Sequence, residues 1–224
     1  LLCVDLSQID ARAMAAHSQD PDYIEAFAPG KDLHTEMAVS LFGDPKRRSG
    51  AKPVTHATSY GMGAKGLAEY AGIDPYEAQQ LLAKLDQQFP KLATFKTQAR
   101  ANAKAYGFVY NAFGRPIRIQ PGRDYTTGPA SYGQGTARDL LVEGILRLPE
   151  DLLPSLRGVI HDELVFSIPE EQVEDAREQI LNALQFVFTI PGGEIPVPIL
   201  AEASLPGRDW ADCYRDEYVK WPEI

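Results

Sequence analysis

The sequence predicts an α+β fold, in which an antiparallel sheet with helices is interrupted by a helical insertion. Strand-like apolar runs stand near both ends of the chain, helix start and stop signals fill residues from about 20 to 106, and hairpin signals return after residue 107. With 224 residues, 44% of them hydrophobic, the chain can bury a sizeable core as one large domain or two small ones.

The first elements are a strand and a helix. The apolar run from Leu1 to Leu6 predicts the strand, and residues 7–10 open a helix that reaches about His17. Asp32 can cap a further helix that ends near Gly43. Its apolar residues are spaced along one face: Leu33, Met37 and Leu41.

The middle of the chain has the strongest helix signals. Asp74 offers a cap, Pro75 suits the first helical position, and Glu77 follows three residues after the cap. We expect this helix to end near residues 89–90 and a following helix to stop at Gly107.

The last part of the chain mixes strands and helices. Residues 108–119 predict a hairpin with its turn at 111–114. The remaining expected elements are a helix at about 128–148, a hairpin at 158–168, an amphipathic helix at 170–187 and a strand at 195–203.

Charge is distributed unevenly along the chain. The net charge is −9, yet the segment from Lys46 to Arg118 holds 12 Lys and Arg against 4 Asp and Glu, a net of +8 that leaves −17 for the rest. A basic segment beside an acidic remainder favours binding of a polyanion. Ordinary solvated helix faces are the alternative explanation.

The composition also excludes some classes of protein. Cys3 and Cys213 stand far apart in the sequence with no CxxC pair, which is typical of a reducing, cytoplasmic protein without structural zinc. No apolar run approaches ~18–20 residues and no signal peptide is recognisable, so we expect no membrane association. The chain begins inside an apolar run without Met, which indicates a piece of something longer.

Two aspartates stand in or beside apolar strands. Asp162 lies between His161 and Glu163 in the apolar run 159–166, and Asp5 follows the run that opens the chain. Burying a carboxylate is costly unless a cation or hydrogen bonds compensate it. Two aspartates from distant strands suit a two-metal site, because Mg²⁺ prefers carboxylate oxygens together with substrate phosphates. An exposed acidic turn and a helix cap near Gln8 are the alternatives.

A stripe of chemically useful side chains recurs every four residues. Arg48, Lys52, His56 and Tyr60 would share one face of a helix. The cations could hold a triphosphate, and the rings could stack on a base or sugar. The alternative, which is commoner for such a pattern, is a basic helix on the protein surface without a ligand.

Three blocks in order resemble the motifs of the DNA polymerase I family (family A): residues 5–12 (DLSQIDAR), Arg48-x3-Lys52-x7-Tyr60-Gly61, and His161-Asp162-Glu163. Supporting matches lie at residues 30–36, 113–115, 134–137 and 207–210, so the resemblance covers nearly the whole chain. It implies an antiparallel palm sheet with helices plus a helical fingers insertion. The domains implied are palm at 1–19, fingers at 20–106 and palm again at 107–224.

The resemblance also implies roles for individual residues, with two Mg²⁺ ions as cofactor and primer–template DNA and dNTPs as partners. Asp5 and Asp162 would be the catalytic, metal-binding aspartates, and Glu163 a secondary neighbour. The nucleotide-binding residues would be Arg48, Lys52, His34, His56, Tyr60, Gln8 and Asp10. The primer–template contacts would be His161, Arg115, Gln134 and Gly61. The reaction implied is attack of a primer 3′-hydroxyl on the α-phosphate.

Three residues depart from the family pattern. Asp10 stands where these enzymes usually have Glu, which blocks the ribose 2′-hydroxyl, so we expect either looser exclusion of ribonucleotides or a neutral change. His56 replaces the usual Phe or Tyr. Pro53 lies inside the expected helix, at a cost of ~3 kcal/mol, and predicts a kink; the alternative is that the helix begins there.

The family's thumb and any proofreading domain have no counterpart in this sequence. We therefore expect the chain alone to be unstable or inactive, and a longer polypeptide or a second subunit to complete it. Two other functions stay open: a single-subunit RNA polymerase, and a non-catalytic nucleic-acid-binding remnant. The Ser7-Gln8 pair and Glu163 favour DNA synthesis, and we expect a bacterial cell or a phage-infected host.

Overall fold

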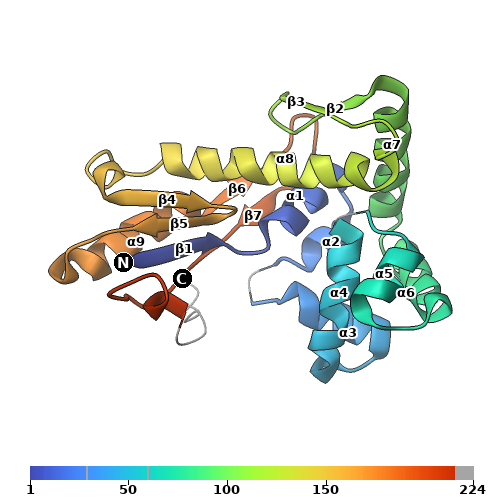
Figure 1. The fold of residues 1–224 in the computed structure, drawn as a ribbon, viewed down its shortest axis with the longest axis horizontal. Helices are drawn as coiled ribbons and strands as arrows, with labels where there is room; N and C mark the ends of the chain where they lie inside the picture. The colour runs from blue at the N-terminus through green and yellow to red at the C-terminus, as the bar shows by residue number, and fades with distance from the viewer. Residues whose placement is uncertain (29, 60, 215–224) are drawn as a thin grey trace. The chain divides into compact units, whose positions relative to one another are not determined.

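The computed structural model describes residues 1–28, 30–59 and 61–214. The chain divides into two compact units. The first comprises Leu1–Ile9, Ala137–Phe188 and Pro198–Ile224; the second comprises Asp10–Thr136 and Thr189–Val197. The mixture of helices with an antiparallel sheet confirms the predicted fold class (Figure 1).

A four-stranded sheet forms the centre of the first unit. Its strands, in the order β4-β5-β1-β8, are all antiparallel to their neighbours. They are β4 (Leu156–Ile160), β5 (Glu163–Phe166), β1 (Leu2–Leu6) and β8 (Ala201–Ala203). The predicted first strand and the predicted hairpin with its turn at residues 161–162 are therefore confirmed.

One helix prediction in this unit is wrong at its C-terminal end. The helix expected at 170–187 is a short 3₁₀ turn, Glu170–Gln172, followed by α9 (Val173–Leu184), which packs against β1 and β8. Gln185 turns extended, and the aromatic and β-branched residues after it form β6 (Phe186–Phe188), paired with β7 (Val197–Ile199). Strand propensity overrides the helical period here. The single strand expected at 195–203 is correspondingly two strands, β7 and β8.

Helices dominate the second unit. They are α1 (Ile9–Ser18), α2 (Pro21–Glu25), α3 (Leu33–Phe42), α4 (Arg48–Ser59), α5 (Ala64–Ala71), α6 (Pro75–Gln88) and α7 (Pro90–Tyr106), with a 3₁₀ turn at Pro45–Arg47. The predicted caps are confirmed, since the side chains of Asp32 and Asp74 accept hydrogen bonds from the amides of Thr35 and Tyr76. Both α3 and α7 end at a left-handed glycine, Gly43 and Gly107, as expected.

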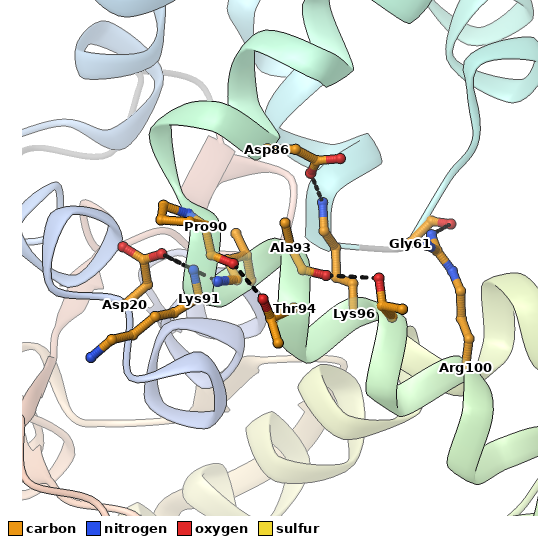
Figure 2. Close-up of polar contacts among 11 residues, drawn as sticks. Asp20, Gly61, Asp86, Pro90, Lys91, Ala93, Thr94, Lys96 and Arg100 are labelled. Carbon is orange, nitrogen blue, oxygen red and sulfur yellow. Dashed lines mark hydrogen bonds and ion pairs between the residues drawn. The ribbon is translucent and has the colours of Figure 1, made fainter.

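Helix α7 is fixed along its length by polar contacts (Figure 2). The buried Asp20 carboxylate accepts hydrogen bonds from the amides of Lys91 and Leu92 in the first turn. Further along, Lys96 pairs with Asp86 at 2.9 Å. Arg100 reaches the backbone carbonyl of Gly61. The helix is therefore a rigid support for the segments on either side of it.

The hairpin predicted after α7 is also present. It consists of β2 (Phe108–Tyr110) and β3 (Pro116–Arg118), and Asn111 holds the turn by accepting from the amides of residues 113 and 115. Helix α8 (Asp124–Leu146) follows; its residues up to Thr136 belong to the second unit and the rest to the first. A 3₁₀ turn at Leu153–Ser155 leads into β4.

Cys3 and Cys213, although distant in sequence, are both buried in one cluster of the first unit with Val165, and neither forms a disulfide. The segment that carries Cys213 includes a 3₁₀ turn, Asp212–Tyr214. Searched over its described residues, the chain has no helix with the length and apolar character needed to cross a membrane.

Candidate active site

A row of carboxylates crosses three neighbouring strands of the sheet in the first unit. Asp5 of β1 is in register with Glu163 of β5 on one side and with Glu202 of β8 on the other. Directly opposed residues of antiparallel strands point to the same face, and like charges in that arrangement repel one another. The row is therefore costly unless something other than the sheet compensates it.

Asp162 joins this row from the turn between β4 and β5. His161, the first of the two turn residues, has φ 57°, a left-handed conformation that non-glycine residues rarely adopt. The Leu6 amide donates to the Asp162 carbonyl at 3.1 Å, which holds Asp162 beside the strand that carries Asp5. Burial, together with the charges of Asp162, Glu163 and Glu202, raises the pKa of Asp5 to about 8. The two aspartates predicted to act together are thus adjacent.

This carboxylate pair has the chemistry of a cation site. Among the described residues, no lysine or arginine forms an ion pair with Asp5 or Asp162. The same residues contain no group of three or more His, Cys, Asp or Glu side chains arranged to hold a metal ion. A hard divalent ion with few protein ligands, such as Mg²⁺, fits two carboxylates that complete its coordination with water and substrate oxygens.

The carboxylate of Glu163 is bound by two residues of the segment that carries Cys213. Its carboxylate is buried and accepts a hydrogen bond from the indole Nε1–H of Trp210 at 3.2 Å and another from the hydroxyl of Tyr214. Both of its oxygens are therefore engaged by donors. Its secondary role stays a prediction.

The turn after β1 places Gln8 in the same unit. Gln8 has φ 55°, so it too is left-handed without being glycine. The Ser7 amide donates to the Leu200 carbonyl and the Ser7 hydroxyl donates to Glu202, which ties this turn to β8. Strained residues persist where the surroundings fix them and are frequent at functional sites.

The second unit holds the predicted cationic cluster. Arg48, at the start of α4, donates through Nε and Nη2 to the two carboxylate oxygens of Asp32 at 2.8 and 3.0 Å. Burial opposes the ionised form of Asp32, but Arg48 and Thr35 outweigh it and hold the pKa of that carboxyl well below its usual range. Asp32 thus caps α3 and fixes the first residue of α4 against it.

His34 of α3 lies within this cluster. It is buried, and within the described part of the chain its Nδ1 has no hydrogen-bond partner. Burial, with the charges of Arg48, His56 and Lys52, lowers the pKa of His34 to about 4, so its ring is neutral at pH 7. A buried nitrogen such as Nδ1 of His34, beside the cations Arg48 and Lys52, is suited to form a hydrogen bond with a bound ligand.

His56 of α4 continues the cluster. Its ring lies 5.8 Å from that of His34 and is stacked at 6.4 Å on Tyr70 of α5, whose hydroxyl is 3.4 Å from Nδ1. Burial, and then the charge of Lys52, lowers the pKa of His56. Arg48, Lys52, His34 and His56 are thus brought together, whereas Tyr60 lies outside the described residues.

The helix runs unbroken through Pro53, from Arg48 to Ser59. The alternative that it begins at Pro53, with Arg48 on a loop, is therefore wrong. Asp10 stands in the first turn of α1, where a carboxylate is favoured by the helix dipole.

The predicted primer–template residues of this unit cluster around α8. Arg115 donates to the carbonyl of Gly135, immediately after the exposed Gln134. Gly61, with φ 61°, packs against Pro129 of the same helix and accepts from Arg100 at 3.1 Å. The fourth residue, His161, belongs to the first unit.

Sequence reasoning missed five residues that shape these clusters: Glu202, Trp210, Tyr214, Asp32 as a partner of Arg48, and Arg100. A charged residue between Ala201 and Ala203 was a detectable signal for Glu202. The other contacts join residues 16 to 51 positions apart, and no local pattern reports them.

Comparisons with known proteins identify a family for the chain. The sequence pattern of DNA polymerase family A matches residues 1–212. The chain is 32% identical to the thermostable DNA polymerase I of Thermus filiformis, over 96% of the chain and 27% of that protein. It is 31% identical to the DNA polymerase of Mycobacterium phage D29, over 96% of the chain and 35% of the phage protein.

A solved structure with the same fold is the POL domain of Pol1 from M. smegmatis in complex with DNA primer-template and dNTP. It has a TM-score of 0.76 and 24% identity, and the match covers 93% of this chain and 39% of that one. The chain spans about a quarter to a third of the length of the curated relatives described above. With the family pattern matched over almost its entire length, this chain belongs to DNA polymerase family A.

Proposed function

We propose that this chain carries the polymerase active site of a template-directed DNA polymerase, which transfers a nucleotide from a dNTP to a primer 3′-hydroxyl. The observation that carries the proposal is the pair Asp5 and Asp162, which come from distant segments and interact with each other beside Glu163 and Glu202. Neither Asp5 nor Asp162 has an ion-pair partner among the described residues. Because the relatives come from bacteria and a phage, we expect this DNA synthesis to take place in the cytoplasm of a bacterium or of a phage-infected host.

In this proposal Asp5 and Asp162 would hold two Mg²⁺ ions. Bound there, the ions would lower the pKa of the primer hydroxyl and neutralise charge on the leaving pyrophosphate. The like charges of Asp162, Glu163 and Glu202 around Asp5 support this role, because a bound cation would offset their mutual repulsion.

The cationic cluster would bind the triphosphate of the incoming nucleotide. The Nε and Nη2 atoms of Arg48 pair with Asp32, and this pairing orients the other edge of the guanidinium, Nη1 and Nη2, which matches phosphate oxygens, before substrate arrives. Lys52 adds a point charge. The Nδ1 of His34, which finds no hydrogen-bond partner among the described residues, would gain one. The flat ring of His56 suits the sugar or base. Gln8 and Asp10 would flank the sugar, and Tyr60 would stand near the templating position.

Primer–template DNA would be gripped by Arg115, Gln134, Gly61 and His161. The left-handed His161 sits beside Asp162 in the turn, so a contact to the primer end would be made next to the catalytic carboxylates.

Primer extension tests the proposal against the two alternatives. In the intact protein, we expect Asp5→Asn and Asp162→Asn to lower Mg²⁺-dependent dNTP incorporation at least about a hundredfold, because each removes a charge that faces the developing transition state. Asp151→Asn, an exposed acid of the same unit, is the matched control and should leave the rate unchanged. Wild-type protein that binds DNA without extending it would support a remnant instead. Incorporation of ribonucleotides without a primer would support an RNA polymerase.

A further inference from the structure

An exposed row of aromatic rings lies where α7 meets the hairpin β2–β3. Tyr106, Phe108 and Tyr110 are 67%, 37% and 55% exposed. Their rings are neighbours, with centroids 6.4 Å apart from Tyr106 to Phe108 and 5.3 Å from Phe108 to Tyr110. A strand on a protein surface ordinarily turns polar side chains outward, so a contiguous aromatic face indicates a binding surface.

The row is held by a rigid support. Val109, between the two exposed strand positions, is buried with Ala103 and Ile119. The Ile119 amide donates to the Gly107 carbonyl, and Asn111 binds the carbonyl of Gly135 through its side chain. The rings are therefore presented without needing to be ordered by a ligand, which lowers the entropic cost of binding.

A hollow of about 530 Å³ opens beside these rings. Tyr106, Phe108, Pro116 and Arg118 line it, and Arg118 is the cross-strand partner of Phe108. Flat apolar rings next to an exposed guanidinium suit a ligand that is itself flat and anionic, such as a nucleotide.

The charge of the surrounding segment points to a polyanion. Between Asp86 and Asp124 the sequence has no acidic residue and seven Lys and Arg. Four of the seven, Lys104, Arg115, Arg118 and Arg123, belong to the end of α7, the hairpin and the turn after it. The excess of positive charge would not strengthen the binding of an apolar protein partner, whereas it would strengthen the binding of a phosphate backbone.

We propose that the row Tyr106, Phe108 and Tyr110, with Arg118, is a binding platform for the unpaired template strand. Bases would stack on the rings, and Arg118 would contact the phosphates. The choice of the template rests on the proposed function, because an unpaired template is the one single strand that every extendable primer–template contains. The same hairpin carries Arg115, one of the proposed primer–template contacts.

Equilibrium binding of the intact protein without dNTP tests the platform. The probes are a fluorescent duplex with a ten-nucleotide 5′ template overhang, the same duplex with blunt ends, and the same duplex with a displaced flap in place of the overhang. We expect Phe108→Ala to weaken binding of the overhang probe about tenfold, as expected for loss of one stacked base. Binding of the blunt probe should stay within about twofold.

Further variants separate the contributions. Phe108→Trp should restore the affinity for the overhang, because it keeps a stacking face. Arg118→Gln should reduce the salt slope of the overhang probe by about 0.7, the value for one phosphate contact on a single strand. Tyr76→Ala, which removes an exposed ring (69%) from α6, is the control and should change neither probe.

Three results would overturn the proposal. Equal weakening of the blunt and overhang probes would mean that the row holds duplex. An effect confined to the flap probe would assign the surface to a displaced strand. A large fall in thermal stability of Phe108→Ala with DNA binding intact would show that another protein segment covers the rings. Asp5→Asn separates this proposal from the proposed function, since it should abolish extension while the overhang stays bound.

Discussion

Asp10 is the residue whose identity departs most directly from the family pattern. It stands in the first turn of α1, one methylene shorter than the Glu expected there. We predict that Asp10→Glu increases the preference for dNTP over rNTP about tenfold, since one methylene in a selective pocket has an effect of this order. The ratio of kcat/KM values for the two nucleotide classes measures it. Unchanged discrimination in Asp10→Glu would show that the shorter carboxylate already closes the pocket.

His17 makes the protein sensitive to acid. Its Nε2 is 2.7 Å from the hydroxyl of Thr136, and its ring packs on Phe95 and Tyr132. Burial lowers the pKa of His17 to about 4, partly opposed by a hydrogen bond with the backbone of Tyr132. The neutral ring is thus favoured in the folded state, so its stabilisation is complete above the unfolded pKa of about 6.5 and is lost as the pH falls towards 4.

We predict that this one group lowers the free energy of unfolding by on the order of 3 kcal/mol between pH 7 and pH 4. Urea denaturation of wild type and of His17→Gln at several pH values isolates it, because every other titrating group is common to both proteins. Two curves that stay parallel across this range would contradict the prediction.

At the scale of elements, Arg100 links α7 to the segment that follows α4. Arg100 donates to the carbonyls of Gly61 and Tyr125 at 3.1 and 3.0 Å, and its guanidinium lies 4.1 Å from the Tyr125 ring centre. We predict that Arg100→Ala raises the KM for dNTP several-fold with a smaller change in kcat, because the turn that ends α4 loses its support. Arg100→Lys should restore the KM for dNTP only in part, because one ammonium cannot reproduce the two hydrogen bonds of the guanidinium.

Arg147→Ala provides the control for this experiment. Arg147 also lies 4.1 Å from an aromatic ring centre, that of Phe186, but belongs to the first unit. Both alanine variants should lose a similar ~1 kcal/mol of stability, and only Arg100→Ala should alter nucleotide use. An equal effect on KM in both would mean that Arg100 acts through general stability alone.

The elements that could be predicted from sequence are those with local signals. Asp32 and Asp74 cap their helices, and Gly43 and Gly107 end theirs, because caps act within three or four residues. The end of α9 at Leu184 could not be predicted, since the pairing of β6 with β7 decides it. Glu202 was missed for the same reason: its place beside Asp5 follows from strand register, which is a long-range property.

At the scale of the whole molecule, the predicted site residues fall into two separate clusters, one in each compact unit. Asp5, Asp162, His161 and Gln8 belong to the first, and the cationic cluster belongs to the second. Chemistry and the resemblance predicted these residues from the sequence, but not their neighbours Glu202 and Asp32. The boundaries at residues 19 and 106 stay a prediction, because the compact units are defined by contacts and not by function.

The chain spans only part of the length of its relatives, which leads to a prediction about this chain expressed alone. We expect it to extend a primed template at least about a hundredfold more slowly than the intact protein, with a lower melting temperature, because it makes fewer backbone contacts to DNA. Extension assays at equal molar concentration compare the two. Processive extension by the isolated chain would contradict this expectation.

Asp20 sets the order in which two helices of the second unit can be capped during folding, α2 before α7. Its Oδ1 accepts from the Tyr23 amide at the start of α2, and its Oδ2 accepts from the amides of Lys91 and Leu92 at the start of α7. One carboxylate therefore completes two helices whose first turns are about seventy residues apart in sequence. On the ribosome, α2 can be capped as soon as it emerges, whereas α7 must find a partner that is already in place. Unfolding of the segment around α2 removes the carboxylate that caps α7, so α7 should not outlast α2, whereas α2 keeps its own cap when α7 unfolds.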